Sequence, residues 1–161
     1  MTSFSTSKLL YRASDNTFNS QTYYSMLSGK TNVLTIFKVK NYVFGSYLGI
    51  ANPYPSISWQ TDSAAFLFSL RRNGTSNTVK LPIIETPYAF LSNYNDFGVY
   101  GRAHDLYVAN PPSTNSNSYV NLGLTYSAPP GCVYQSSCAQ NFFTGTYTGW
   151  LVDEIEAYQL S

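Results

Sequence analysis

The sequence predicts a mostly β protein with short helices, in which two antiparallel sheets pack face to face as a β-sandwich. Three observations lead to this fold class. Short runs of β-branched and aromatic residues recur along the chain, separated by Gly, Pro or Asn. Aromatic residues make up 17% of the chain and charged residues only 11%, which suits a filled core under a neutral, polar surface. Only one segment, near the amino end, has clear helical spacing.

The first two elements are a strand and a helix. The run "LLYRAS" at 9–14 predicts a strand. In "FNSQTYYSML" at 18–27 the apolar residues recur at helical spacing, with Asp15 or Asn16 as the candidate N-cap. Gly29 follows as a C-terminal stop. We therefore expect one short amphipathic helix after the first strand.

The next two runs predict a β-hairpin. "NVLTIFKVK" at 32–40 and "YVFGSYL" at 42–48 both alternate with a period of two, and Lys40 and Asn41 lie between them. Asparagine tolerates the positive φ that tight hairpin turns need, so Asn41 suits the tip. Gly45, inside the second strand, indicates a bulge or a close backbone approach.

The rest of the chain predicts further strands. "AAFLFSLRR" at 64–72 is almost entirely apolar until its arginines and predicts a buried central strand. Shorter candidates follow at 77–83, 88–92, 98–101 and 105–109. The terminal "GWLVDEIEAYQL", at 149–160, predicts one strand with a bulge near Asp153.

Length and charge limit the classes of function. The 161 residues contain no repeat and no linker-like run, so we expect a single domain over 1–161 with its core at about 9–160. A net charge of +1 gives no broad basic surface for nucleic acid. No run approaches the roughly 18 apolar residues of a membrane span, so we expect no membrane insertion.

The two cysteines leave two interpretations open. Cys132 and Cys138 are too far apart for a CxxC redox pair and have no neighbouring histidines for a zinc site. They are either free thiols or a small-loop disulfide. The sequon at Asn73 is a candidate glycosylation site, and a glycan or a disulfide would indicate an oxidising compartment.

The polar residues predict neither catalysis nor a metal site. His104 and Asp105 are neighbours in a predicted strand, where adjacent side chains point to opposite faces, so they do not form a base and its orienting acid. Asp153, Glu154 and Glu156 form an acidic cluster with no second carboxylate predicted opposite, as glycoside hydrolysis would require. We expect a noncatalytic protein without cofactors.

Six segments, taken in order, resemble the TLDc domain family over nearly the whole chain. They are "LLYRASDNTFNSQTYYSMLSGK", "NVLTIFKVKNYVFGSYLG", "DSAAFLFSL", "HDLYVA", "SYVNLGLTY" and "DEIEAYQL". The resemblance implies a sandwich of two antiparallel sheets with short helices and no agreed catalytic centre. It also implies an intracellular module that protects against oxidative stress and binds the vacuolar proton-pumping ATPase (V-ATPase).

Three functional hypotheses follow. The first is a cytoplasmic protein-interaction module in which four charged residues contact a partner, and V-ATPase subunits are the partner that the resemblance implies. These residues are Arg102, Asp105, Glu154 and Glu156. The alternative is an extracellular or structural sandwich that associates with itself or with glycans through a Tyr/Asn/Ser-rich surface. The third is a peroxide-handling enzyme that uses Cys132 or Cys138 as a thiolate.

Overall fold

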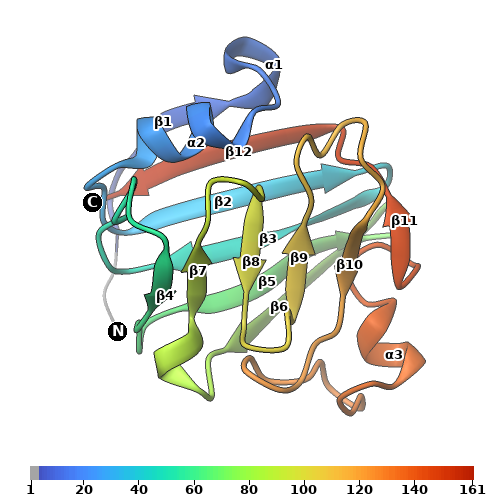
Figure 1. The fold of residues 1–161 in the computed structure, drawn as a ribbon. Coiled ribbons are helices and arrows are strands. Elements are labelled where there is room, and N and C mark those ends of the chain that lie inside the picture. The colour runs from blue at the N-terminus through green and yellow to red at the C-terminus, as the bar shows by residue number, and fades with distance from the viewer. Residues whose placement is uncertain (1–3) are drawn as a thin grey trace.

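The computed structural model describes residues 4–161, which form two six-stranded antiparallel sheets packed as a β-sandwich (Figure 1). The predicted fold class is therefore confirmed. The long sheet has the order β1 (Ser7–Arg12), β12 (Glu154–Leu160), β2 (Val33–Val39), β3 (Tyr42–Leu48), β5 (Phe66–Arg72), β6 (Thr75–Pro82). The short sheet has the order β11 (Thr148–Trp150), β10 (Ser118–Val120), β9 (Leu106–Val108), β8 (Gly98–Tyr100), β7 (Phe90–Ser92), β4 (Ser58–Gln60).

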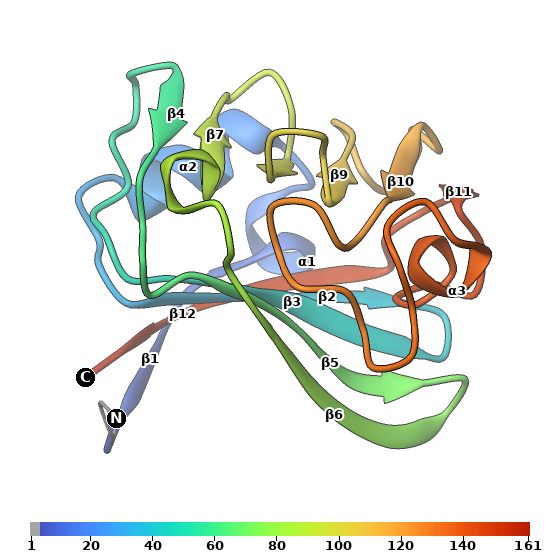
Figure 2. The same ribbon diagram turned by 90° about the horizontal axis from the view of Figure 1, so that it is seen from below.

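Short helices close the ends of the sandwich. They are α1 (Ala13–Asn16), α2 (Ser20–Leu27), the 3₁₀ turn η1 (Thr86–Tyr88) and α3 (Ser137–Gln140). Figure 2 shows the two sheets as separate layers, with α3 beside β11. None of the helices in the described part of the chain is long and apolar enough to cross a membrane.

The amino-terminal elements differ in detail from the prediction. β1 ends at Arg12, two residues early, because the chain turns into α1. The N-cap of α2 is Asn19, whose Oδ1 accepts the N–H of Thr22 at 3.0 Å. Asp15 and Asn16 were the wrong candidates because they belong to α1, whose C-cap Thr17 has a φ of +79° that interrupts the helix before α2 starts.

The β2–β3 hairpin forms at the predicted position, with Val39 opposite Tyr42. The positive φ, +51°, falls on Lys40 and not on Asn41. A hydrogen bond to Asp153 holds Lys40 in this backbone conformation: Oδ2 of Asp153 accepts the N–H of Lys40 at 2.6 Å. This contact ties the hairpin tip to the residue before β12.

Gly45 makes the close approach that its position in the strand predicted. A Cβ at this position would lie 2.0 Å from the carbonyl oxygen of Thr35 and 2.7 Å from Cζ of Phe68. The ring of Phe68 occupies the space over the glycine, and Phe68 is 6% exposed. Gly45 therefore leaves room for the side chain of Phe68 on the outer face of the long sheet.

The carboxyl-terminal segment is not one bulged strand, and that prediction was wrong. β11 ends at Trp150 in the short sheet, and β12 begins at Glu154 in the long sheet. Residues 151–153 carry the chain from one layer to the other. The crossing lets Trp150 and Ile155 both point into the core, where they are 4% and 0% exposed.

The predicted central strand is β5, which has β3 and β6 on its two sides. Its first half is buried as expected, but a register shift between Ser69 and Arg71 turns Leu70 and Arg71 toward solvent. The core between the sheets is rich in aromatic rings. Phe44 stacks on Phe143 at 4.8 Å between ring centroids and meets Trp150 edge-on at 5.9 Å.

Candidate functional site

Asp105 is a buried structural residue and cannot contact a partner, so its assignment to a binding surface is corrected. Its side chain is 0% exposed. Its two carboxylate oxygens accept four consecutive backbone N–H groups, those of Gly123, Leu124, Thr125 and Tyr126, at 3.0–3.2 Å. Burial raises the pKa of Asp105, while these four donors favour the charged form and oppose the increase. Asp105 thus anchors residues 123–126 to the β8–β9 turn.

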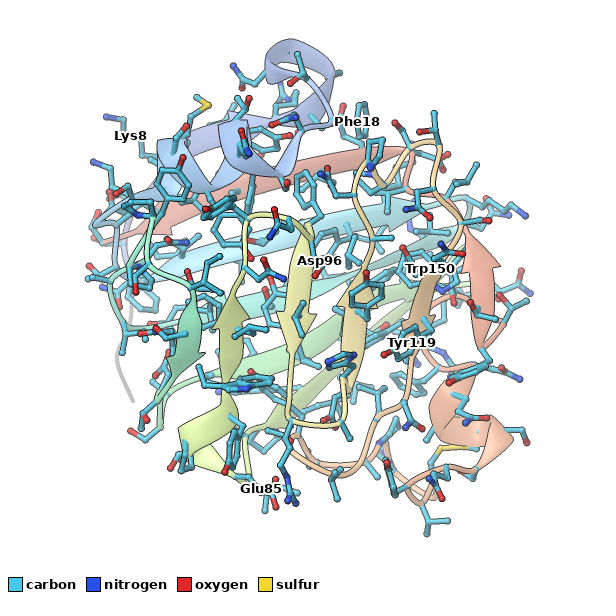
Figure 3. The ribbon with its side chains drawn as sticks, in the orientation of Figure 1. Lys8, Phe18, Glu85, Asp96, Tyr119 and Trp150 are labelled. Carbon is cyan, nitrogen blue, oxygen red and sulfur yellow. A yellow bond between two sulfur atoms is a disulfide. The ribbon has the colours of Figure 1, made fainter. Side chains whose placement is uncertain are left out.

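Arg102 lies in the same turn and is exposed. Its guanidinium makes a two-pronged ion pair with Glu85, at 2.8 Å and 3.1 Å. Figure 3 shows Glu85 at the edge of the molecule, beyond the end of the short sheet. Arg102 therefore belongs to the end of the sandwich at the β8–β9 turn.

Glu154 and Glu156 lie on β12, and their side chains face outward from the long sheet. Glu156 accepts from Arg12 Nε at 2.7 Å and from the hydroxyl of Tyr158 at 2.7 Å. Glu154 accepts the backbone N–H of Ser14 at 3.1 Å. Burial opposes ionisation of Glu154, but the hydrogen bonds from Ser14 and its neighbours outweigh burial and lower the pKa. Both carboxylates are therefore held in place by the amino-terminal elements.

The structure does not bring the four predicted partner residues together. Arg102 and Asp105 lie in a turn of the short sheet, and Glu154 and Glu156 lie on the long sheet. Within each pair the residues are close in sequence, but the two pairs belong to different layers of the sandwich. Only the glutamates remain as candidates for one contact surface.

The glutamates line a hollow of about 450 Å³ on the outer face of the long sheet. We call this site the acidic hollow; its lining residues are Ile36, Lys38, Val43, Asp153, Glu154 and Glu156. The contributions of β2 and β3 were not predicted, although the pairing of Lys38 with Glu154 follows from the strand register. Three carboxylates line the acidic hollow with one lysine, and Glu156 also pairs with Arg12. One negative charge is left in excess, which favours a basic group from a partner.

His104 and Asp105 bind different groups in the structure, and they are not strand neighbours as predicted from the sequence. Both His104 and Asp105 precede β9 and lie in the β8–β9 turn, where His104 has a φ of +57°. The imidazole Nδ1 pairs with the hydroxyl of Tyr119, and its ring stacks on Tyr107 at 5.6 Å. Burial lowers the pKa of His104.

The aromatic group around His104 is tied to one carboxylate. Tyr107 donates its hydroxyl to Asp96 at 2.7 Å, and Tyr119 stacks on Tyr107 at 5.1 Å. Figure 3 shows Asp96 and Tyr119 at the short sheet. The hydroxyls of Tyr107 and Tyr119 therefore both have hydrogen-bond partners. Cross-strand packing explains the position of these two residues and of His104.

Cys132 and Cys138 form a disulfide, with their Cα atoms 5.5 Å apart. The bond closes the loop that leads into α3, whose N-cap Ser136 accepts the N–H of Ala139 at 3.2 Å. In this form neither sulfur is a thiolate. Asn73, the sequon residue, is exposed at the tip of the β5–β6 hairpin.

Within residues 4–161, no three His, Cys, Asp or Glu side chains are grouped so as to hold a metal ion.

The model of the TLDc domain family matches residues 2–161. The chain belongs to the TLDc domain family. The resemblance found in the sequence is thus confirmed over essentially the whole domain. A search of curated proteins found no match to this TLDc domain.

Proposed function

We propose that this TLDc domain is a noncatalytic, cytoplasmic protein-interaction module that binds V-ATPase subunits through the acidic hollow. The observation that carries the proposal is the acidic hollow itself, where the carboxylates of Glu154 and Glu156 stand at the surface beside apolar side chains. A mixed apolar and charged depression is suited to a protein partner that presents a basic side chain. The pump is named as the partner because of the family resemblance.

The buried carboxylates support a noncatalytic role. The carboxylate of Asp105 accepts hydrogen bonds from four backbone N–H groups, as described above. Asp62, 4% exposed, accepts the N–H groups of Gly49 at 2.6 Å and Ala64 at 2.9 Å. Carboxylates whose oxygens already accept backbone N–H groups are poorly available for acid–base chemistry on a substrate.

Protection against oxidative stress is the other role that the resemblance implies, and we propose it on that basis alone.

A pull-down with charge-reversed variants tests the proposal. We expect V-ATPase subunits to co-purify with the tagged domain, and the variant Glu154→Lys with Glu156→Lys to retain less than about a tenth of them, because two like charges then face the partner's basic group. The matched control is Glu85→Lys, which reverses a carboxylate in the segment after β6, outside the acidic hollow and its ion pairs. Absence of pump subunits from the unaltered domain would contradict the proposed partner, and equal loss in the control would contradict the site.

A second candidate is an extracellular or structural sandwich that associates with itself or with glycans, and the disulfide is the observation that favours it. Disulfides persist mainly in oxidising compartments. The exposed position of Asn73 is compatible with a glycan at the same hairpin tip.

Intact mass of the protein from its natural source separates the two candidates. For the extracellular candidate we expect two cysteines that resist alkylation until they are reduced, and a glycan mass that is lost in Asn73→Gln. Two cysteines that alkylate without reduction, on a chain with an unmodified Asn73, would exclude that candidate and leave the cytoplasmic module.

A further inference from the structure

The loop around α3 makes no backbone hydrogen bond to distant parts of the described chain. We call residues 130–141 the α3 loop, and Figure 1 shows it at one corner of the sandwich beside β11. Every backbone–backbone hydrogen bond of these residues is to another residue between 129 and 145. The four-residue helix is too short to be stable by itself in water. The α3 loop therefore depends on side-chain contacts and on its disulfide for its position.

Few apolar groups hold the α3 loop on the sandwich. Ala139, 0% exposed, is its one buried side chain, and Cys132 is half-buried against the core. The backbone of Tyr134 packs against Gly123, where a Cβ would lie 3.2 Å from N and Cα of Tyr134. Because these contacts bury little apolar surface, opening of the loop has a small free-energy cost.

The chain on either side of the α3 loop is held firmly. Phe143 is 0% exposed and stacks on Phe44, with 4.8 Å between ring centroids. Nε of Arg72 donates to the carbonyl oxygen of Phe142 at 2.9 Å, and the guanidinium carbon lies 4.1 Å from the centroid of the Phe142 ring. Pro129, just before the loop, is buried. The α3 loop thus lies between two fixed ends and can open without them.

The disulfide is the covalent link that closes the α3 loop. It joins Cys132 near the start of the loop to Cys138 in α3. A bond with a sequence separation of 6 limits the conformations of the opened loop, which lowers the open population roughly 40-fold. Figure 3 shows the disulfide beside α3 near the edge of the molecule, and Cys138 is exposed. A reductant in solution can therefore reach the bond.

We propose that the Cys132–Cys138 disulfide is a redox latch that controls the opening of the α3 loop. With the bond intact, the loop stays on the sandwich. With the bond reduced, residues 130–141 open while the two sheets stay folded. Opening uncovers the backbone at Gly123, which Tyr134 covers in the closed loop. An oxidising compartment keeps the latch closed, and a reducing one opens it.

The latch opens by thiol–disulfide exchange with a dithiol reductant. One thiolate of the reductant attacks Sγ of Cys138, the S–S bond breaks, and its electron pair leaves on Sγ of Cys132, which takes up a proton. The second thiolate of the reductant then attacks the mixed disulfide and releases Cys138, which is protonated in turn. Two electrons pass to the protein, and the reductant becomes a disulfide.

The latch does not rest on V-ATPase binding. It uses neither Glu154 nor Glu156, and it is measured on the purified chain alone. Failure of the pull-down therefore leaves the latch unaffected, and failure of the latch leaves the acidic hollow unaffected.

Hydrogen–deuterium exchange of the purified chain, read by mass spectrometry, tests the latch. The chain oxidised by oxidised glutathione is compared with the chain reduced by dithiothreitol. We expect the amides of residues 130–141 to exchange at least about tenfold faster after reduction, because their exchange follows the open population. The amides of β2, β3 and β12 should exchange at the same rate in both states. Reoxidation should restore the slow exchange, as a reversible latch requires.

Two controls accompany this measurement. The variant Cys132→Ser with Cys138→Ser lacks the bond, so exchange in the α3 loop should be fast and unaffected by dithiothreitol. Thermal unfolding of this variant establishes that it is folded. The loop at 110–117 contains no cysteine, and its exchange should be the same with and without the reductant.

Three outcomes would overturn the proposal. The first is equal exchange of residues 130–141 in the oxidised and reduced chains. The second is faster exchange in β2, β3 and β12 as well, which would mean that the bond stabilises the whole domain and not the loop. The third is a chain whose two cysteines still react with an alkylating agent after treatment with oxidised glutathione, because the latch then never closes.

Discussion

Replacing Asp105 by alanine is expected to lower the free energy of unfolding by about 4 kcal/mol. The substitution removes the acceptor of four backbone N–H groups at 123–126 and leaves them in a buried place without a partner. Gly101 shows how closely the site is packed, because a Cβ there would lie 2.2 Å from Oδ1 of Asp105. Urea denaturation of the purified domain measures the loss.

Two further substitutions control this prediction. Asp105→Asn keeps one acceptor oxygen but turns an amide donor toward backbone N–H groups, so we expect about half of the loss. Asp15→Ala removes an exposed carboxylate and should change stability by less than about 0.5 kcal/mol. A loss for Asp105→Ala as small as that for Asp15→Ala would show that the four contacts do not stabilise the turn.

Replacing Gly45 by alanine is expected to cost about 3 kcal/mol. The added methyl group meets a backbone carbonyl of β2 and the ring of Phe68, as described above, and strand β2 cannot move without breaking its pairing with β12. Thermal or urea unfolding should show a clear drop in the midpoint.

Gly149 is the matched control for Gly45. Its φ is +84°, and a Cβ there meets nothing within 4 Å, so Gly149→Ala should cost only the strain of a left-handed backbone, about 1 kcal/mol. Equal losses at the two glycines would mean that the strands near Gly45 separate easily. That result would also weaken the account of Phe68 as a side chain fixed on the outer face.

Local pattern predicted those parts of the fold that depend on neighbouring residues. The β2–β3 hairpin follows from the two-residue period of its strands, which sets the register once the turn is placed. That the positive φ falls on Lys40 instead of Asn41 could not be predicted, because it depends on a hydrogen bond that the N–H of Lys40 donates to Asp153, more than 100 residues away. Helix α2 was placed correctly, but its N-cap depends on a break at Thr17 that carries no sequence signal.

The candidate site could be predicted only in part. Glu154 and Glu156 were identified from their cluster, whereas Lys38 and Val43 join them through strand pairing. Asp105 was misassigned because a charged residue at the start of a short predicted strand resembles a surface residue. Its burial follows from donors about 20 residues later in the chain, which only the folded backbone places around it.

By itself, the sequence determined the fold class, the family and the order of most strands, because these follow from periodic apolar residues and turn residues that act over short distances. The tertiary structure alone decided which sheet each strand joins. It split the terminal run between the two layers at residues 151–153, so that Trp150 and Ile155 could both enter the core. It also aligned one residue from each of the six strands across the outer face of the long sheet, because pairing between distant strands depends on packing that no local pattern encodes. These residues are Leu9, Tyr158, Leu34, Tyr47, Phe66 and Pro82.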